Sequence, residues 1–209
     1  MRATIVALAA ILSIASPAWA EEAPFGAVSS APLPRGGLAI WGEAGYPGVR
    51  VGFREGYRSF EVGGEGGFDL GATTFFAALT GRTALYRSGS LSLSLDGKLG
   101  GFADAGSQWH DASNRTGAGL LFELGSRLTY KTGWPLSLLV FVRLPVEAPF
   151  TQGGSVKVVG LLGVGTEIAV GHDCFILFSG AFGPDLRSNV PVLARLAVEA
   201  TAGFGYRVF

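Results

Sequence analysis

The sequence predicts an all-β chain that folds as a closed antiparallel up-and-down transmembrane barrel of ten strands, with eight strands as the alternative. Three observations lead to this prediction. Apolar residues alternate with polar or small residues in segment after segment, which is the period of a strand with two unlike faces. The mean hydropathy is high at +0.39, yet no segment after Ala20 approaches the roughly eighteen apolar residues of a membrane helix. Backbone polar groups in lipid must be paired internally, so a chain that crosses without helices has to close into a barrel.

Composition and charge narrow the class of protein further. Glycine supplies 33 of 209 residues, more than twice the usual share of about 7%. Lys+Arg and Asp+Glu are 16 each, so the chain lacks the basic excess of a nucleic-acid binder, and no nucleic-acid partner is expected. The single cysteine, Cys174, cannot form an internal disulfide.

The first twenty residues predict a secretory signal peptide. Arg2 supplies a positive charge, an apolar run follows, and Ala18-Trp19-Ala20 places small residues where a signal peptidase cleaves. Residues 21–37 are rich in Ala, Pro and Ser and predict a periplasmic lead-in, extended or disordered. The barrel domain is expected to occupy 38–209.

Ten segments show the strand alternation. They are 38–46, 49–55, 58–68, 73–86, 90–102, 117–130, 135–144, 155–170, 174–182 and 192–209.

The first four strands are separated by short turns. Segment 38–46 (LAIWGEAGY) alternates aliphatic residues with Trp and Glu, and a Pro-Gly turn follows it. Segment 49–55 (VRVGFRE) alternates Val and Phe with Arg. Segment 58–68 is weakened by its glycines but still alternates Phe and Val with Glu. Segment 73–86 sets Phe, Ala and Leu against Thr and Arg.

The next three strands have the clearest pattern. Segment 90–102 (SLSLSLDGKLGGF) places leucines on one face and Ser, Asp and Lys on the other. A long polar loop, 104–115, precedes segment 117–130, where Leu and Phe oppose Glu, Arg and Thr. Segment 135–144 opposes Leu and Val to Ser and Arg, and we expect Pro145 to end its ladder because proline cannot donate a backbone hydrogen bond.

The last three strands complete the set. Segment 155–170 opposes Val, Leu and Ile to Lys and Glu, and a Gly-His-Asp turn follows. Segment 174–182 is apolar on both faces apart from Ser179. Segment 192–209 alternates over about fifteen residues, far more than the five or six of an ordinary strand, and the chain ends on Phe209.

This long last strand with its terminal aromatic residue resembles the final strand of small bacterial outer-membrane β-barrel proteins. The resemblance implies export to the outer membrane of a Gram-negative cell, contact with outer-membrane lipid, and recognition of the C-terminal strand by the barrel-insertion machinery. Such barrels have short periplasmic turns and longer outer loops. If residue 209 is periplasmic, loops 104–115, 147–154 and 183–191 are outside, and turns 87–89, 131–134 and 171–173 are periplasmic.

If the apolar faces contact lipid, the opposite faces collect charges of both signs inside a narrow lumen. The predicted lumen charge network comprises Glu43, Arg50, Arg54, Glu61, Glu65, Arg82, Asp96, Lys98, Glu123, Arg127, Arg143, Lys157, Glu167, Arg195 and Glu199. Buried charges persist when they are paired, so one interpretation is a lumen filled by ion pairs. The other is a pore whose balanced lining gives little ion selectivity.

Catalytic chemistry has one candidate location. His110 lies in the long loop beside Asp111, with Ser107 and Ser113 nearby. A Ser/His/Asp arrangement needs these groups within hydrogen-bond reach of one another, and one polar loop permits that without implying it. We therefore expect no enzymatic activity. No metal site or cofactor is expected, because the two histidines and one cysteine lack metal-ligand spacing.

The function expected from the sequence is a structural or surface-interaction role, exercised through the outer loops of a barrel with a charge-filled lumen. A narrow, weakly selective channel for small solutes is the alternative. A soluble lipocalin-like binder, which would have apolar residues inside, and a lipid-modifying enzyme at the outer rim are further alternatives. The sequence leaves the oligomeric state open.

Overall fold

The computed structural model describes residues 33–106, 117–150, 154–188 and 195–208. Within these ranges the regular structure is entirely β. The strands are β1 (Leu38–Tyr46), β2 (Gly48–Gly56), β3 (Phe60–Asp69), β4 (Thr74–Ser88), β5 (Leu91–Asp104), β6 (Gly117–Lys131), β7 (Leu136–Pro149), β8 (Lys157–Val159), β9 (Leu161–Val170), β10 (Cys174–Arg187) and β11 (Arg195–Val208).

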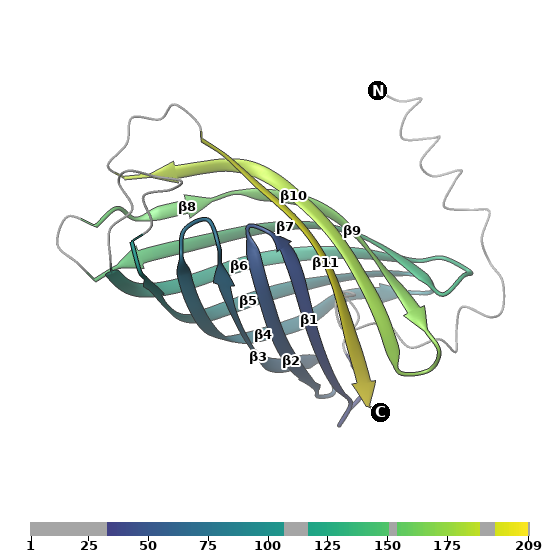
Figure 1. The fold of residues 1–209 in the computed structure, drawn as a ribbon. Helices are drawn as coiled ribbons and strands as arrows, with labels where there is room; N and C mark the ends of the chain where they lie inside the picture. The colour runs from purple at the N-terminus through teal and green to yellow at the C-terminus, as the bar shows by residue number, and fades with distance from the viewer. Residues whose placement is uncertain (1–32, 107–116, 151–153, 189–194, 209) are drawn as a thin grey trace.

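The strands form a closed antiparallel barrel (Figure 1). Apart from β8 and β9, each strand pairs with the next along the chain, and β11 closes the sheet by pairing with β1 from Leu38↔Val208 to Tyr46↔Ala200. Strands β8 and β9 both pair with β7 and β10, so the eleven strands occupy ten positions around the barrel. The predicted ten-stranded up-and-down barrel is therefore confirmed.

The interruption between β8 and β9 lies at Gly160. The register of β10 with its neighbours continues from Phe182↔Leu162 to Asp185↔Val159, which places Pro184 opposite Gly160. Gly160 donates its N–H to the Pro184 carbonyl at 3.0 Å, but Pro184 has no N–H to return. The boundary between β8 and β9 thus coincides with the ladder bond that Pro184 cannot donate.

The predicted end of the seventh strand at Pro145 is wrong. Strand β7 continues to Pro149, and the register runs unchanged from Leu124↔Leu144 through Glu123↔Pro145 to Phe122↔Val146. Proline removes one donor, while the residues on either side of it keep the ladder in register. Strand β10 likewise continues to Arg187, into the segment 183–191 that was predicted to be a loop.

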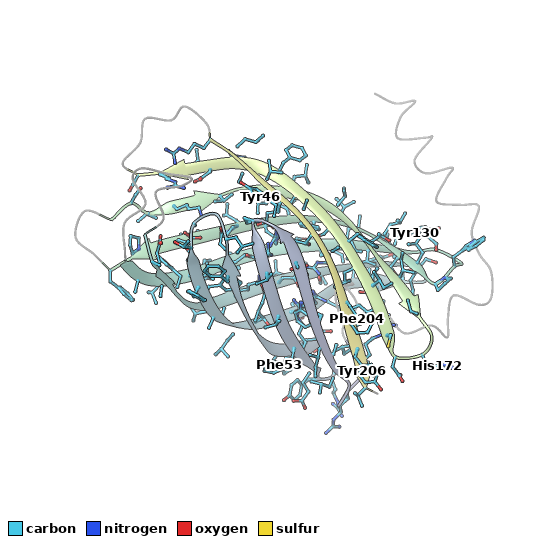
Figure 2. The ribbon with its side chains drawn as sticks, in the orientation of Figure 1. Tyr46, Phe53, Tyr130, His172, Phe204 and Tyr206 are labelled. Atoms are coloured by element: carbon cyan, nitrogen blue, oxygen red, sulfur yellow. The ribbon has the colours of Figure 1, made fainter. Side chains whose placement is uncertain are left out.

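The two faces of the sheet differ as the alternation predicts. Side chains that point outward are apolar and exposed, such as Phe53 at 51% and Phe204 at 55% (Figure 2). Side chains that point inward include buried Glu61, Arg82 and Ser94. Among the described residues, no helix is long and apolar enough to cross a bilayer.

The end of the barrel with short turns carries several aromatic residues. Trp134 and Tyr86 are exposed there. Tyr206 is also exposed, whereas Tyr130 is half-buried (Figure 2). Phe209 lies outside the described residues. The ring of Tyr57 stacks on that of Phe60 with centroids 5.0 Å apart, which extends the aromatic set at this end.

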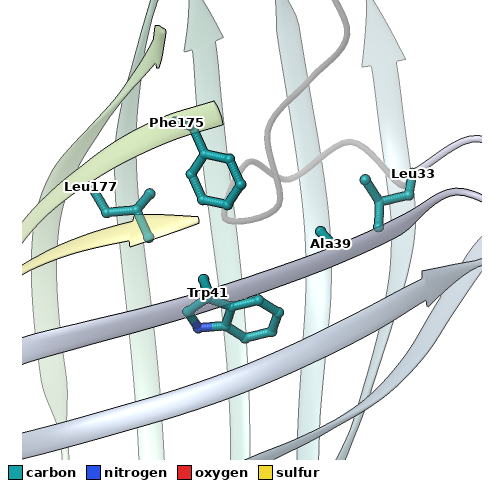
Figure 3. Close-up of a cluster of buried hydrophobic side chains, with 5 residues drawn as sticks. All are labelled: Leu33, Ala39, Trp41, Phe175 and Leu177. Atoms are coloured by element: carbon teal, nitrogen blue, oxygen red, sulfur yellow. The ribbon is translucent and has the colours of Figure 1, made fainter. Parts of the chain in front are cut away.

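The same end is filled from inside by an apolar cluster. Leu33, from the predicted lead-in, packs with Ala39 and Trp41 of β1 and with Phe175 and Leu177 of β10 (Figure 3). All five side chains are buried. The segment before the first strand therefore contributes to the barrel interior.

The opposite rim is oblique. The β1–β2 hairpin turns at Pro47, part-way up the wall, whereas β10 and the start of β11 extend well beyond it (Figure 1). The β1–β11 ladder ends at Tyr46↔Ala200, while β11 continues back to Arg195 against β10. The wall is therefore low at β1 and β2 and high at β10 and β11.

Candidate functional site

The interior charges form two connected groups. The lower network, nearer the short turns, links Arg54, Glu61, Arg82, Asp96 and Arg127 across β2 to β6. Glu61 lies 3.8 Å from Arg54 and 3.6 Å from Arg82, and it also accepts a 2.6 Å hydrogen bond from the Leu33 N–H. Asp96 pairs with Arg82 at 2.5 Å and with Arg127 at 3.6 Å. The lower network thus ties the lead-in segment to the barrel wall.

The upper network lies above it and joins strands on opposite sides of the lumen. Its members are Glu43, Arg50, Glu65, Lys98, Glu123, Arg143 and Glu199. The central carboxylate is Glu199 of β11, which accepts a 2.8 Å bond from Arg50 of β2 and a further bond from Arg143 of β7.

The lysine in this network holds two acids at once. Lys98 lies 2.9 Å from Glu65 and 3.4 Å from Glu123, and Glu123 is 4.0 Å from Arg143. The contacts therefore run from β3 through β5, β6 and β7 to β11. Because β7 and β11 are not neighbours in the sheet, the Arg143–Glu199 contact crosses the lumen.

Aromatic rings pack between the charges. The Arg54 guanidinium lies 4.9 Å from the Trp41 ring centre, and that of Arg207 lies 5.3 Å from Phe175. Phe141 contacts Arg143 in the same way at 5.3 Å. Such contacts stabilise a cation that has lost part of its water, so rings and ion pairs together fill the interior.

A cavity of about 360 Å³ opens above the upper network, at the end with the longer loops. Its floor is formed by the charges of Arg50, Lys98, Glu123, Arg143 and Glu199, among others. Its walls include apolar side chains of β4 to β9, and its rim carries further charged residues. The cavity is a space within the described residues where a ligand could lie against the network.

The structure brings together fourteen of the fifteen residues of the predicted lumen charge network in ion pairs. Twelve belong to the two networks described above. Glu167 pairs with Arg207 at 3.8 Å, and Lys157 pairs with Glu147 at 3.2 Å. Arg195 is exposed and lines the rim of the cavity.

The interior charges that were missed from the sequence include Lys131, Arg207, Glu147, Asp185 and Arg187. Arg207 is 2% exposed, and the alternation of the last strand places it on the same face as Glu199. Glu147, Asp185 and Arg187 were assigned to loops because strands β7 and β10 were predicted to end too early. Asp185 and Arg187 pair with each other at 3.1 Å. Continuing the period of two past Pro145 and residue 183 would have identified all three.

Among the described residues, the structure does not bring a Ser, a His and an acidic side chain together as a catalytic set. The loop with Ser107, His110, Asp111 and Ser113 lies outside the described residues. His172 lies in the turn between β9 and β10 (Figure 2). The described residues contain no group of three or more His, Cys, Asp or Glu side chains placed to hold a metal ion.

Comparison with known proteins does not identify a family for this chain. No protein-family model matches the chain, and no curated protein matches it at a significant level.

Proposed function

We propose that this chain is a bacterial outer-membrane β-barrel protein of structural or surface-interaction role, with a lumen closed by paired charges. The observation that carries the proposal is the segregation of side chains across the sheet. Exposed apolar residues cover the outer face of the strands, while twelve charged residues meet in two interior networks. This is the inverse of a soluble barrel that stores an apolar ligand.

The position of the charge that remains on the outer face supports insertion in a membrane. In the described strands, exposed Glu55 shares the outer face of β2 with Val51 and Phe53, and it lies near the end with short turns. A charge on the lipid face costs about 2–4 kcal/mol at the midplane and about 0–1 kcal/mol near the interface. Glu55 therefore lies where a charge is tolerated.

The closed lumen favours a structural role over a channel. A continuous path for solutes would have to pass the upper network, the lower network and the cluster around Leu33 in succession. The upper network and the cluster around Leu33 join side chains from strands that are apart in the sheet, while the lower network follows the neighbouring strands β2 to β6 and holds the Leu33 N–H. The outer loops are then the part that remains available for interaction.

Membrane insertion is tested by fractionation and heat-modifiability. We expect the protein in the outer-membrane fraction, and a folded form that migrates differently on a gel before and after boiling. Recovery in the periplasm without detergent would contradict the proposal.

Closure of the lumen is tested by planar-bilayer conductance of the refolded protein. We expect no steady open level, because two layers of ion pairs and one apolar cluster block the path. A stable conductance in protein that is shown to be folded by heat-modifiability would instead support the channel alternative.

A further inference from the structure

Strand β11 has an unpartnered edge in the upper part of the wall. Its ladder with β1 ends at Ala200, while residues 196–199 continue upward paired with β10 alone. Within the described ranges no strand lies on their other side. The N–H and C=O groups that point away from β10 here need a polar partner, because lipid offers none.

The cavity reaches this edge and passes around it. Its lining includes inward-facing Ala197 and Glu199 of β11, and it also includes Leu196 and Val198, which point outward. Across the gap it includes outward-facing Val49 of β2. The cavity is therefore continuous with the apolar outer surface between the β1–β2 hairpin and β11.

The two parts of this space have different chemistry. The sideways mouth is apolar, with Leu196 at 68% and Val198 at 44% exposed. The inner part is lined by both signs of charge, among them the Arg50–Glu199–Arg143 contacts and the Lys157–Glu147 pair. An occupant that satisfies both parts has a hydrocarbon chain outside and a polar head inside.

The charged residues that line the cavity determine which kind of head group fits there. Six bases and seven acids line the cavity, so its formal charge is near −1. A head of single sign would lie against lining residues of its own sign, and like-charge contact costs binding free energy. A zwitterionic head offers a phosphate to the arginines and an ammonium to the carboxylates.

We propose that the cavity is a lateral binding site for a single-chain zwitterionic amphiphile from the surrounding membrane, such as a lysophospholipid. The head lies above the upper network and pairs with the free edge of β11. The chain leaves the barrel through the gap and lies on Leu196 and Val198. This inference rests on the proposed membrane location, since the apolar mouth has such a ligand beside it only in a bilayer.

Binding is tested with the folded protein in nanodiscs, titrated with lysophosphatidylcholine and followed by native mass spectrometry. An alkyl sulfate and an alkyl trimethylammonium of equal chain length serve as the anionic and cationic comparisons. We expect one retained molecule of the zwitterion, bound at least about tenfold more tightly than either comparison. Equal retention of all three would overturn the assignment of the head group.

Two variants with matched controls locate the site. Ala197→Phe places a ring in the cavity, and Ala202→Phe places the same ring on the outer face of β11 outside the cavity lining. Leu196→Asn makes the mouth polar, and Leu99→Asn changes an outward leucine of similar exposure away from the cavity. We expect both site variants to weaken binding roughly tenfold, while both controls bind as the original protein does.

These experiments distinguish the lateral binding site from the proposed membrane location. Heat-modifiability of each variant reports whether the barrel is folded and inserted, independently of the ligand. Binding that is the same in site and control variants of an inserted barrel would overturn the lateral site alone. Failure of the unaltered protein to insert would overturn the membrane proposal first.

Discussion

At the scale of single residues, an inward position in this barrel requires a charged side chain to have a partner. Glu61 shows this most clearly, since it is 1% exposed and contacts Arg54, Arg82 and the Leu33 N–H. The alternation of the strands places such residues inside, but it does not say which partner each one finds.

Removing the charge of Glu61 should destabilise the barrel. Glu61→Gln retains an oxygen that can accept the Leu33 hydrogen bond but removes the carboxylate that two arginines face. We expect the free energy of unfolding to fall by about 3 kcal/mol, because breaking a buried ion pair leaves buried charge uncompensated. Urea titration of the protein in vesicles, followed by tryptophan fluorescence, measures the change.

The matched control is Glu147→Gln in the cavity lining. The Lys157 and Glu147 side chains are 25% and 30% exposed, so this pair should contribute no more than about 1 kcal/mol. Equal losses in the two variants would show that burial does not determine the contribution of these pairs.

At the scale of the strand, glycine lets aromatic rings lie flat against the inner wall. A Cβ at Gly205 of β11 would collide with the Phe175 ring of β10, and one at Gly163 would collide with Phe141. The excess of glycine in the sequence is thus partly explained by close contacts inside the barrel.

Gly205→Ala should therefore cost about 1–3 kcal/mol of stability, because the Phe175 ring must shift within a packed cluster. Gly97→Ala is the control, since the nearest atom to its Cβ would be 4.0 Å away. We expect the control to unfold within about 0.5 kcal/mol of the original protein. A loss of similar size at Gly97 would point to backbone conformation rather than to the ring contact.

The strand scale also shows where prediction from the sequence was weakest. The starts and ends of β1 to β6 lie close to the predicted ones, because hairpin turns with Gly or Pro mark them. Strands β7 and β10 were predicted too short, because Pro145 and Gly183 were taken as ends. Residues on both sides of these positions hold the register, and this support is not visible in the local sequence.

At the scale of the whole molecule, the interior is organised in layers. The apolar cluster around Leu33 closes the end with short turns, the two networks lie above it, and the cavity opens toward the longer loops. Most of these charges are shielded from solvent by the barrel wall. The interior ion pairs should therefore be less sensitive to salt than ion pairs on a protein surface.

Raising the salt concentration should therefore change stability little. Surface ion pairs are screened between about 0.1 M and about 1 M salt, whereas buried pairs are screened much less. We expect the urea concentration at the unfolding midpoint to remain nearly constant over this range when the barrel is held in vesicles of lipids without net charge. A large fall with sodium chloride would mean that ions reach the networks, and would count against a closed lumen.

The sequence by itself determined the properties that depend on local periodicity. Period-two alternation assigns the inner and outer face of each strand, and the spacing of turns predicts ten consecutive antiparallel strands. Together they identify fourteen interior residues that the structure joins in ion pairs.

Only the tertiary structure decided which residues meet across the lumen and where the wall is open. The contact between Arg143 and Glu199 joins β7 to β11, and it depends on the stagger and diameter of the closed barrel. The insertion of Leu33 and the unpartnered edge of β11 depend on how the last strand closes against the first. These features are set by strand register around the whole barrel, which no single segment of the sequence contains.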